Sequence, residues 1–262
     1  MYQLGQTLLT LDSVSLSFGS NLILRDISFE IKDILREETT GQVVTLIGES
    51  GVGKTQLMKM IAGLVQPTSG KILLGPGQKP VKAGLVGLVD QKYPLFQHRT
   101  LISNLKLVSS DTPKIEFYLN EFNLFEHKSK YPAQLSGGQR QRAAIVQQLL
   151  CSEHFILFDE PFSGLDLKAI DKLCDVINKV AKLDEFNTVI ISSHILEPSL
   201  ALSDKAWILG YDKDSEGNKI PGAVIKYETN LAKQGLAWRK DIRFDPDFIN
   251  FVKQIERTFK SL

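Results

Sequence analysis

Residues 135–139 of this chain form a candidate phosphate-binding site. Their sequence is Leu135, Ser136, Gly137, Gly138 and Gln139. Apolar residues at helical spacing between 145 and 150 predict that a helix starts here, with Ser136 as its cap. The two glycines leave backbone N–H groups uncovered at the positive end of the helix dipole, where a phosphate binds. Turn statistics alone favour an ordinary loop, so the interpretation depends on the other motifs.

A second candidate phosphate site, at residues 48–55, fits G-x-x-x-x-G-K-[ST] at every required position. It reads, in order, Gly48, Glu49, Ser50, Gly51, Val52, Gly53, Lys54 and Thr55. The apolar run 43–47 is typical of a strand buried on both faces, and residues 54–64 have helical spacing. In this setting Lys54 reaches the β- and γ-phosphates and Thr55 binds Mg²⁺. The pattern predicts a nucleoside triphosphate site.

Polar residues also follow two further apolar runs. Asp159 and Glu160 end the run at 155–158, and His194 follows the run at 188–191. A carboxylate at the end of a strand can bind Mg²⁺, and a second one can polarise an attacking water. In isolation, such a pair is usually a solvated loop entrance and such a histidine is usually structural.

Together, these motifs resemble the nucleotide-binding subunit of an ABC transporter. Residues 48–55 resemble the Walker A loop, residues 135–139 the ABC signature, and residues 155–160 the Walker B strand with its glutamate. The other matches are the D-loop ending at Asp166, the switch histidine His194, the Q-loop glutamine Gln91 and the adenine-stacking aromatic Phe18. The matches fall in the family's order and cover residues 8–210. Phe18 could instead be a core residue at a strand end.

The resemblance implies an α/β fold: a P-loop NTPase cassette with a parallel-sheet core, an antiparallel β layer and a small helical subdomain, followed by a C-terminal extension. We expect the antiparallel layer and the Walker A part of the core at 1–91, the helical subdomain at 92–142, the rest of the core at 143–210, and the extension at 211–262. Polar–apolar alternation within residues 7–31 favours the antiparallel layer.

We also expect particular local structures in several shorter segments. The polar residues 32–40 are expected to form a surface loop, and residues 146–148 replace the family's usual alanine-arginine pattern. Residues 212–222 suggest a hairpin-like turn, and the stretch from 226 to 243 is expected to be irregular. Residues 247–259 predict an amphipathic helix.

The resemblance further implies ATP and Mg²⁺ as cofactors and a head-to-tail dimer with a second copy or a homologous subunit. Each ATP would lie between Lys54 of one subunit and residues 136–138 of the other. The implied catalytic residues are Glu160, which activates water, with His194, Lys54 and Gln91. The implied metal ligands are Thr55, Gln91 and Asp159.

Composition and charge limit the kinds of partner and the location that we expect for this chain. The 262 residues carry a net charge of +1 and include 43% hydrophobic and 23% charged residues, which gives no electrostatic case for a nucleic-acid partner. We see no apolar stretch near the ~20 residues that span a bilayer and no basic signal at the N-terminus. The cysteines, Cys151 and Cys174, are expected to be reduced packing residues. The expected location is the cytoplasmic face of the membrane, through a permease.

Two classes of function remain open: a transport ATPase, with a permease and a substrate-binding protein as partners, and a non-transport ATPase of the iron–sulfur assembly type. Residues 93–101 resemble the Q-loop exit of import ATPases, where a permease docks, and favour transport. Tyr93, Leu95, Phe96 and Leu101 should divide between packing under the helical subdomain and lining a groove. The tail from 221 to 248 resembles that of nitrate, sulfonate and taurine importers, which favours small anionic solutes. A lipid-trafficking ATPase is the alternative.

Overall fold

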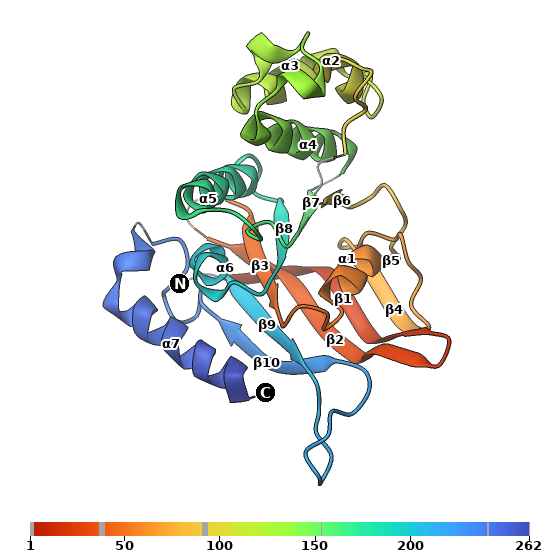
Figure 1. The fold of residues 1–262 in the computed structure, drawn as a ribbon, viewed down its shortest axis with the longest axis vertical. Coiled ribbons are helices and arrows are strands. Elements are labelled where there is room, and N and C mark those ends of the chain that lie inside the picture. Colours follow the sequence, from red (N-terminus) through yellow and green to blue (C-terminus); the bar gives the residue numbers. More distant parts are fainter. Residues whose placement is uncertain (1–2, 37–39, 91–93, 153, 240, 262) are drawn as a thin grey trace.

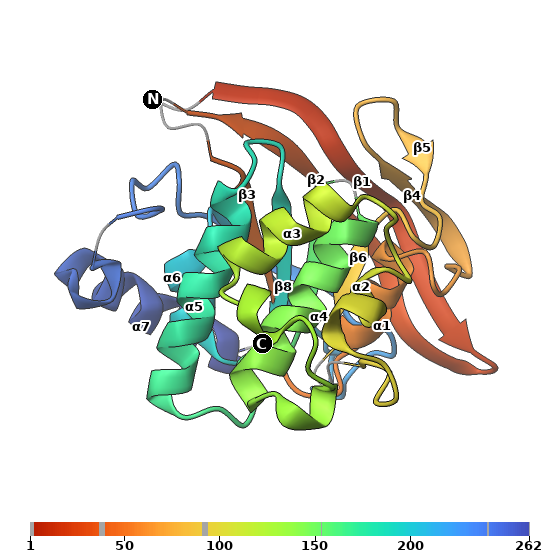
Figure 2. The ribbon, with the colours of Figure 1, turned by 90° about the horizontal axis from the view of Figure 1, so that it is seen from above.

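The computed structural model describes residues 3–36, 40–90, 94–152, 154–239 and 241–261. Its strands form an antiparallel sheet of order β2-β1-β4-β5 and a mixed sheet of order β10-β9-β3-β8-β7-β6. In Figure 1 the two sheets lie side by side, and α2, α3 and α4 stand together above the mixed sheet. Figure 2 shows the antiparallel sheet along one side of the molecule and α7 on the other.

The antiparallel sheet contains β1 (Gln3–Phe18), β2 (Asn21–Leu35), β4 (Ser69–Leu74) and β5 (Lys79–Pro80). The antiparallel layer expected within residues 7–31 is therefore present. The expected surface loop at 32–40 is wrong for its first part, because β2 continues through Leu35. Lys32 pairs with Thr7 and Ile34 with Leu4, and the Ile34 side chain is buried.

The mixed sheet has β3 (Gln42–Ile47), β6 (Gly87–Val89), β7 (Phe155–Asp159), β8 (Thr188–Ser193) and β9 (Lys205–Gly210), all parallel, with β10 (Val224–Asn230) antiparallel at the edge. Each apolar run expected to be a buried strand is one. All six residues of β3 are buried, as its continuous apolar pattern requires. The expectation of an irregular stretch from 226 is wrong as far as Asn230, which ends β10.

The helices are α1 (Lys54–Ile61), α2 (Leu101–Leu105), α3 (Thr112–Glu121), α4 (Gly137–Cys151), α5 (Leu167–Lys182), α6 (Leu196–Leu202) and α7 (Pro246–Ser261). Short 3-10 turns are η1 (Phe125–His127), η2 (Pro132–Gln134) and η3 (Ile242–Phe244). The helix predicted over 54–64 ends earlier, because Gly63 adopts a φ of 71° and turns the chain. The subdomain boundaries stay a prediction, and α4 runs unbroken across residue 142.

Three buried apolar clusters hold these layers together. In one, α1 packs between the two sheets, with Leu57 and Met58 fully buried. In the second, α2 to α5 cover the face of the mixed sheet opposite α1. In the third, η3 and α7 pack against α6 and the end of β3 through residues such as Ile242, Phe248 and Ile47. The C-terminal extension is therefore part of the core that supports the strand ends.

The two glutamines that depart from the family pattern in α4 fix this helix to its neighbours. Gln147 is buried and its Nε2 donates to the carbonyl oxygen of Asn104, 3.4 Å away. Gln148 Oε1 accepts a hydrogen bond of 3.1 Å from the backbone N–H of Leu88 in β6. The signature helix is thus joined to the strand that precedes Gln91, a residue outside the described ranges.

One prediction about the cysteines is wrong. Cys174 is buried on α5, as expected of a packing residue, and burial raises the pKa of its thiol to about 12. Cys151, the last residue of α4, is exposed, although partial burial still raises the pKa of its thiol. Among the described helices, none has both the length and the apolar character needed to cross a membrane.

Candidate functional site

The loop at residues 48–53 joins the end of β3 to the start of α1 and has the backbone of a phosphate-binding loop. Gly53 adopts a φ of 107°, a conformation that side chains with a Cβ rarely adopt. A Cβ at this position would also lie 2.9 Å from Leu24 Cδ2 of β2. The backbone conformation favours glycine at this position, and any other residue would also force the Leu24 side chain to shift.

Helix α1 begins without a side-chain cap, whereas Thr100, Asp111, Ser136 and Asp166 cap the starts of α2, α3, α4 and α5. The first N–H groups of a helix have no partner within the helix and carry the positive end of its dipole. The start of α1 therefore leaves N–H groups without a side-chain partner, which suits it to bind an anion.

Lys54 binds the backbone of the loop through its side chain. Its side chain is only 3% exposed. The ammonium donates to the carbonyl oxygens of Gly48 at 2.7 Å and Glu49 at 2.9 Å. It also lies 2.8 Å from Glu160 Oε1. A buried ammonium with three oxygen partners is fully satisfied, because it has three N–H donors.

The Glu160 carboxylate contacts both Lys54 and His194. Its Oε2 lies 2.8 Å from His194 Nδ1, so the carboxylate bridges the lysine and the histidine. Glu160 adopts a φ of 49°, in the left-handed region that costs free energy outside glycine. Its N–H donates to the carbonyl oxygen of Ser192 at 3.0 Å and to Ser192 Oγ at 3.1 Å. These bonds from β8 hold the strained residue in place.

Ser192 is a site residue that the sequence analysis did not single out. Its hydroxyl also donates to Asp159 Oδ1 at 2.5 Å, so Ser192 orients the Asp159 carboxylate and holds the backbone of Glu160. The pairing of Asp159 with Ser192 across β7 and β8 sets this contact. The available signal was the position of Ser192 at the end of a predicted buried strand, two residues before His194.

Oxygen ligands for a magnesium ion are present at this edge. Thr55 carries an exposed hydroxyl in the first turn of α1, and Asp159 a partly exposed carboxylate. Hard oxygen ligands of this kind suit Mg²⁺, which usually takes one or two protein ligands together with phosphate oxygens and water. Within the described ranges no cluster of three His, Cys, Asp or Glu residues could hold a metal by itself. The third expected ligand, Gln91, lies outside the described residues.

Phe18 lies at the end of β1, where the chain turns into β2. Its side chain is 53% exposed. The alternative that Phe18 is a core residue is therefore wrong, since core phenylalanines in this fold, such as Phe158, are almost fully buried. An exposed aromatic ring at the end of a strand is free to stack on a planar ligand.

The residues 136–139 form a helix start of their own, apart from Lys54. Ser136 Oγ accepts from the N–H of Gln139 at 3.2 Å, and Gln139 Oε1 accepts from the N–H of Ser136 at 2.8 Å. These two bonds form a capping box. Gly137 and Gly138, which lie between its two residues, are exposed to solvent. Helix α4 packs against α2, α3 and β6, whereas α1 packs against β7 and β8, and the two lie apart in Figure 1.

Asp166, which ends the segment that resembles the D-loop, caps α5. Its Oδ1 accepts a hydrogen bond of 2.8 Å from the N–H of Ala169. The residue is exposed, so its second carboxylate oxygen faces solvent. The structure therefore gathers Lys54, Asp159, Glu160 and His194 at one strand edge, and places residues 136–139 and Asp166 at two other helix starts.

Comparison with known proteins places this geometry in context. The family model described as ABC transporter matches residues 25–163. The chain is 35% identical to the sulfate/thiosulfate import ATP-binding protein CysA of Mesorhizobium japonicum, over 71% of this chain and 56% of that protein. It is 31% identical to the spermidine/putrescine import ATP-binding protein PotA of Chromobacterium violaceum, over 97% of this chain and 68% of that protein. The chain thus spans little more than half the length of the CysA relative.

Solved structures share the fold. The structure of cbiO1 from Clostridium perfringens, part of the ABC transporter complex cbiONQ, matches with a TM-score of 0.71 at 21% identity, over 88% of this chain and 91% of that chain. A bacterial Atm1-family ABC exporter with ATP bound matches with a TM-score of 0.67 at 20% identity, over 95% of this chain and 42% of that chain. At these identities the likeness shows a common α/β cassette fold.

Proposed function

The chain belongs to the ABC transporter family, and on this premise we propose that it is an ATP-hydrolysing subunit that dimerises around ATP and drives a separate membrane permease. The observation that carries the proposal is the position of the Glu160 carboxylate, which contacts the Lys54 ammonium with one oxygen and the His194 imidazole with the other. A phosphate-binding lysine, a carboxylate base and a histidine at one strand edge are the groups that phosphoryl transfer to water needs.

Each residue then has a defined role. The uncapped N–H groups of α1 and the Lys54 ammonium bind the phosphates, and Phe18 stacks on the adenine. Glu160 orients the attacking water and accepts its proton, and His194 holds the second Glu160 oxygen and contacts the terminal phosphate. Thr55 and Asp159 would hold Mg²⁺, with Gln91 as the further ligand. The metal neutralises phosphate charge.

A second subunit completes the site in this proposal. The N–H groups of Gly137 and Gly138 are suited to a phosphate but belong to a helix that packs away from α1. In a head-to-tail pair, these residues of one copy, or of a homologous subunit, would face Lys54 of the other. Asp166, at the exposed start of α5, would line the same interface.

A permease is the proposed membrane partner, docking near residues 91–101. Leu95 and Leu101 are buried beneath the helical subdomain, whereas Phe96 is 54% exposed and meets the His98 ring edge-on at 5.8 Å. Tyr93 lies outside the described residues. An exposed aromatic pair in a loop is typical of an interaction surface. The protein would thus sit at the cytoplasmic face of the membrane.

Import is the proposed direction, because both curated relatives quoted above are named as import ATP-binding proteins. One of these names refers to anions and the other to polyamines, so the proposed cargo is a small charged solute delivered by a substrate-binding protein. Nothing in the described fold favours the iron–sulfur assembly or lipid-trafficking alternatives.

Release of phosphate from ATP tests the proposal. The wild-type protein should release phosphate in the presence of Mg²⁺ and stop when the metal is chelated, and Glu160→Gln should reduce the rate by at least 100-fold. A wild-type protein that binds ATP but releases no phosphate, alone or with its permease, would contradict it.

A further inference from the structure

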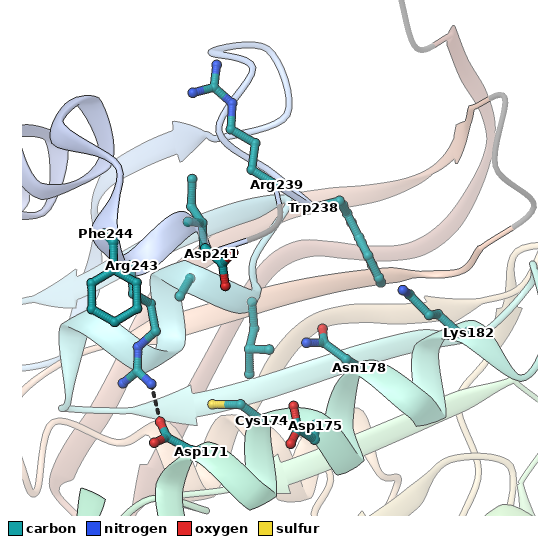
Figure 3. A pocket seen from close by; sticks show the side chains of 13 residues that line it. Asp171, Cys174, Asp175, Asn178, Lys182, Trp238, Arg239, Asp241, Arg243 and Phe244 are labelled. Carbon is teal, nitrogen blue, oxygen red and sulfur yellow. Dashed lines mark hydrogen bonds and ion pairs between the residues drawn. The ribbon is translucent and has the colours of Figure 1, made fainter.

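Arg243, in the C-terminal extension, contacts two helices of the core at the same time. Its guanidinium pairs with both carboxylate oxygens of Glu197 on α6, through Nε and through Nη2, the latter at 2.5 Å. Its Nη1 donates to Asp171 Oδ1 on α5. Figure 3 shows the contact with Asp171 at the edge of a cavity of about 500 Å³ between α5 and the extension. A forked pair of this kind fixes direction as well as distance.

The two helices start directly after two loops of the proposed active site. Helix α5 begins at Leu167, after its cap Asp166, and Asp171 lies in the second turn. Helix α6 begins at Leu196, two residues after His194, and Glu197 lies in its first turn. The start of α6 has no side-chain cap. Arg243 thus ties together the two segments that carry the D-loop aspartate and the switch histidine.

The extension is anchored to the core by buried apolar residues. Ile242, next to Arg243, is buried in the cluster that includes Ile47, the last residue before the phosphate-binding loop. Phe248 and Ile255 of α7 are also buried there. This apolar contact anchors the extension without Arg243. The Glu197 carboxylate, as the main cause, raises the pKa of Arg243 above its usual range, so the charge persists.

We propose that Arg243 is a positioning residue for ATP hydrolysis: by bridging Glu197 and Asp171 it sets the start of α6 against α5 and so holds His194 at Glu160. The inference rests on the proposed ATPase function. His194 contacts the Glu160 carboxylate both through its ring and through its backbone N–H, at 3.4 Å. A small rotation of the first turn of α6 therefore changes both contacts, and displacements near 1 Å at a reacting centre can cost about 100-fold in rate.

The first test compares Arg243→Gln with Arg239→Gln. Arg239 is a matched control, because it belongs to the same extension but its ion pair is with Asp245, also in the extension. We expect Arg243→Gln to lower kcat about 10-fold while KM for ATP changes less than about two-fold, since the effect acts on water activation rather than on binding. Arg239→Gln should keep the wild-type kcat. An unchanged kcat in Arg243→Gln would overturn the proposal.

Two further measurements separate positioning from loss of structure. Arg243→Lys keeps the charge but cannot form the fork and also reach Asp171, so its kcat should lie between those of wild type and Arg243→Gln. Thermal unfolding of both variants should stay within a few degrees of wild type. If kcat falls in each Arg243 variant only in proportion to a fall in its melting temperature, the role of Arg243 is merely structural and the proposal is overturned.

A readout without turnover distinguishes this inference from the ATPase proposal. The chain has four histidines, so ¹⁵N-histidine labelling gives a simple spectrum in which His194→Gln identifies the His194 signals. Arg243→Gln should move the His194 ring signals and leave those of His98 and His127 unchanged. If the wild type hydrolyses no ATP but these signals move, the ATPase proposal fails and the positioning link stands. If the His194 signals stay, the link is wrong.

Discussion

The Lys54 ammonium lies 2.8 Å from Glu160 Oε1, so the proposed phosphate ligand and the proposed base are an ion pair in the protein alone. The pair is well shielded, since the lysine side chain is 3% exposed and the glutamate 20%. A buried charge that loses its partner is costly. Phosphate binding at Lys54 would supply a new partner and free the Glu160 carboxylate for water. In the proposed mechanism the ion pair would therefore link nucleotide binding to the activation of the base.

Lys54→Ala should lose most of its nucleotide affinity, because the phosphate charge is left without its counter-charge. A charge-assisted hydrogen bond contributes about 1.5–3 kcal/mol, which predicts roughly a 10- to 100-fold weaker affinity. Titration with a fluorescent ATP analogue measures it. Lys59→Ala, in the last turn of α1, is the control and should bind as the wild type does. Wild-type affinity in Lys54→Ala would contradict the placement of the phosphates.

Phe18→Ala should weaken ATP binding by ~1–3 kcal/mol, by analogy with bases that stack on aromatic side chains. The melting temperature of the nucleotide-free protein should hardly change, because the ring is exposed. Phe96→Ala is a matched control, since its ring has nearly the same exposure (54% against 53%) but belongs to a different segment, which is hydrogen-bonded to Asn104 of α2. A loss of stability with unchanged affinity would refute stacking.

Phe96→Ala should uncouple transport from hydrolysis in a reconstituted complex with the permease. The exposed ring contributes to the proposed docking surface, whereas hydrolysis by the isolated subunit should not depend on it. Phe117→Ala, which removes an equally exposed ring from α3, should leave transport intact. If transport by Phe96→Ala matches wild type, the docking surface lies elsewhere and the non-transport alternative gains support.

Cys174 should make the fold less stable above about pH 9. Burial is the main reason that the pKa of this thiol is raised from 9.0 to about 12 in the folded chain. Between these values the unfolded chain has lost the thiol proton and the folded chain still carries it. Raising the pH therefore favours unfolding, with a slope of about 1.4 kcal/mol per pH unit.

Urea unfolding at pH 8 and pH 10 measures this effect. The wild type should lose about 1 kcal/mol more than Cys174→Ala over this interval. Cys151→Ala is the comparison: burial also raises the pKa of this more exposed thiol, but by less, so this variant should retain more of the wild-type pH dependence than Cys174→Ala does. Equal pH dependence in the wild type and in Cys174→Ala would show that the thiol is not protected by the fold.

Local patterns in the sequence were enough to predict the elements. The buried runs before Gly48, Asp159 and His194 became β3, β7 and β8, because continuous apolar residues suit strands covered on both faces. The amphipathic pattern after residue 246 became α7. In each case the signal lies within one segment and does not depend on the rest of the chain.

Contacts between distant segments could not be predicted in this way. The polar sequence at the end of β2 is typical of a loop, but Ile34 pairs with Leu4 of β1, which is distant in sequence. The left-handed backbone of Glu160 depends on Ser192 in the next strand. The bridge from Arg243 to Asp171 and Glu197 joins segments whose charges, read along the sequence, look like ordinary solvated surface.

The molecular mass of Glu160→Gln with ATP tests the central claim most directly, since the claim is that two copies close around ATP and that Glu160 activates the water. The variant keeps Lys54 and the loop but lacks the carboxylate base. Size-exclusion chromatography with light scattering should give a dimer of Glu160→Gln in Mg²⁺-ATP and a monomer without nucleotide. The double variant Lys54→Ala/Glu160→Gln should stay monomeric under both conditions. A Glu160→Gln protein that binds ATP and remains a monomer would contradict the account.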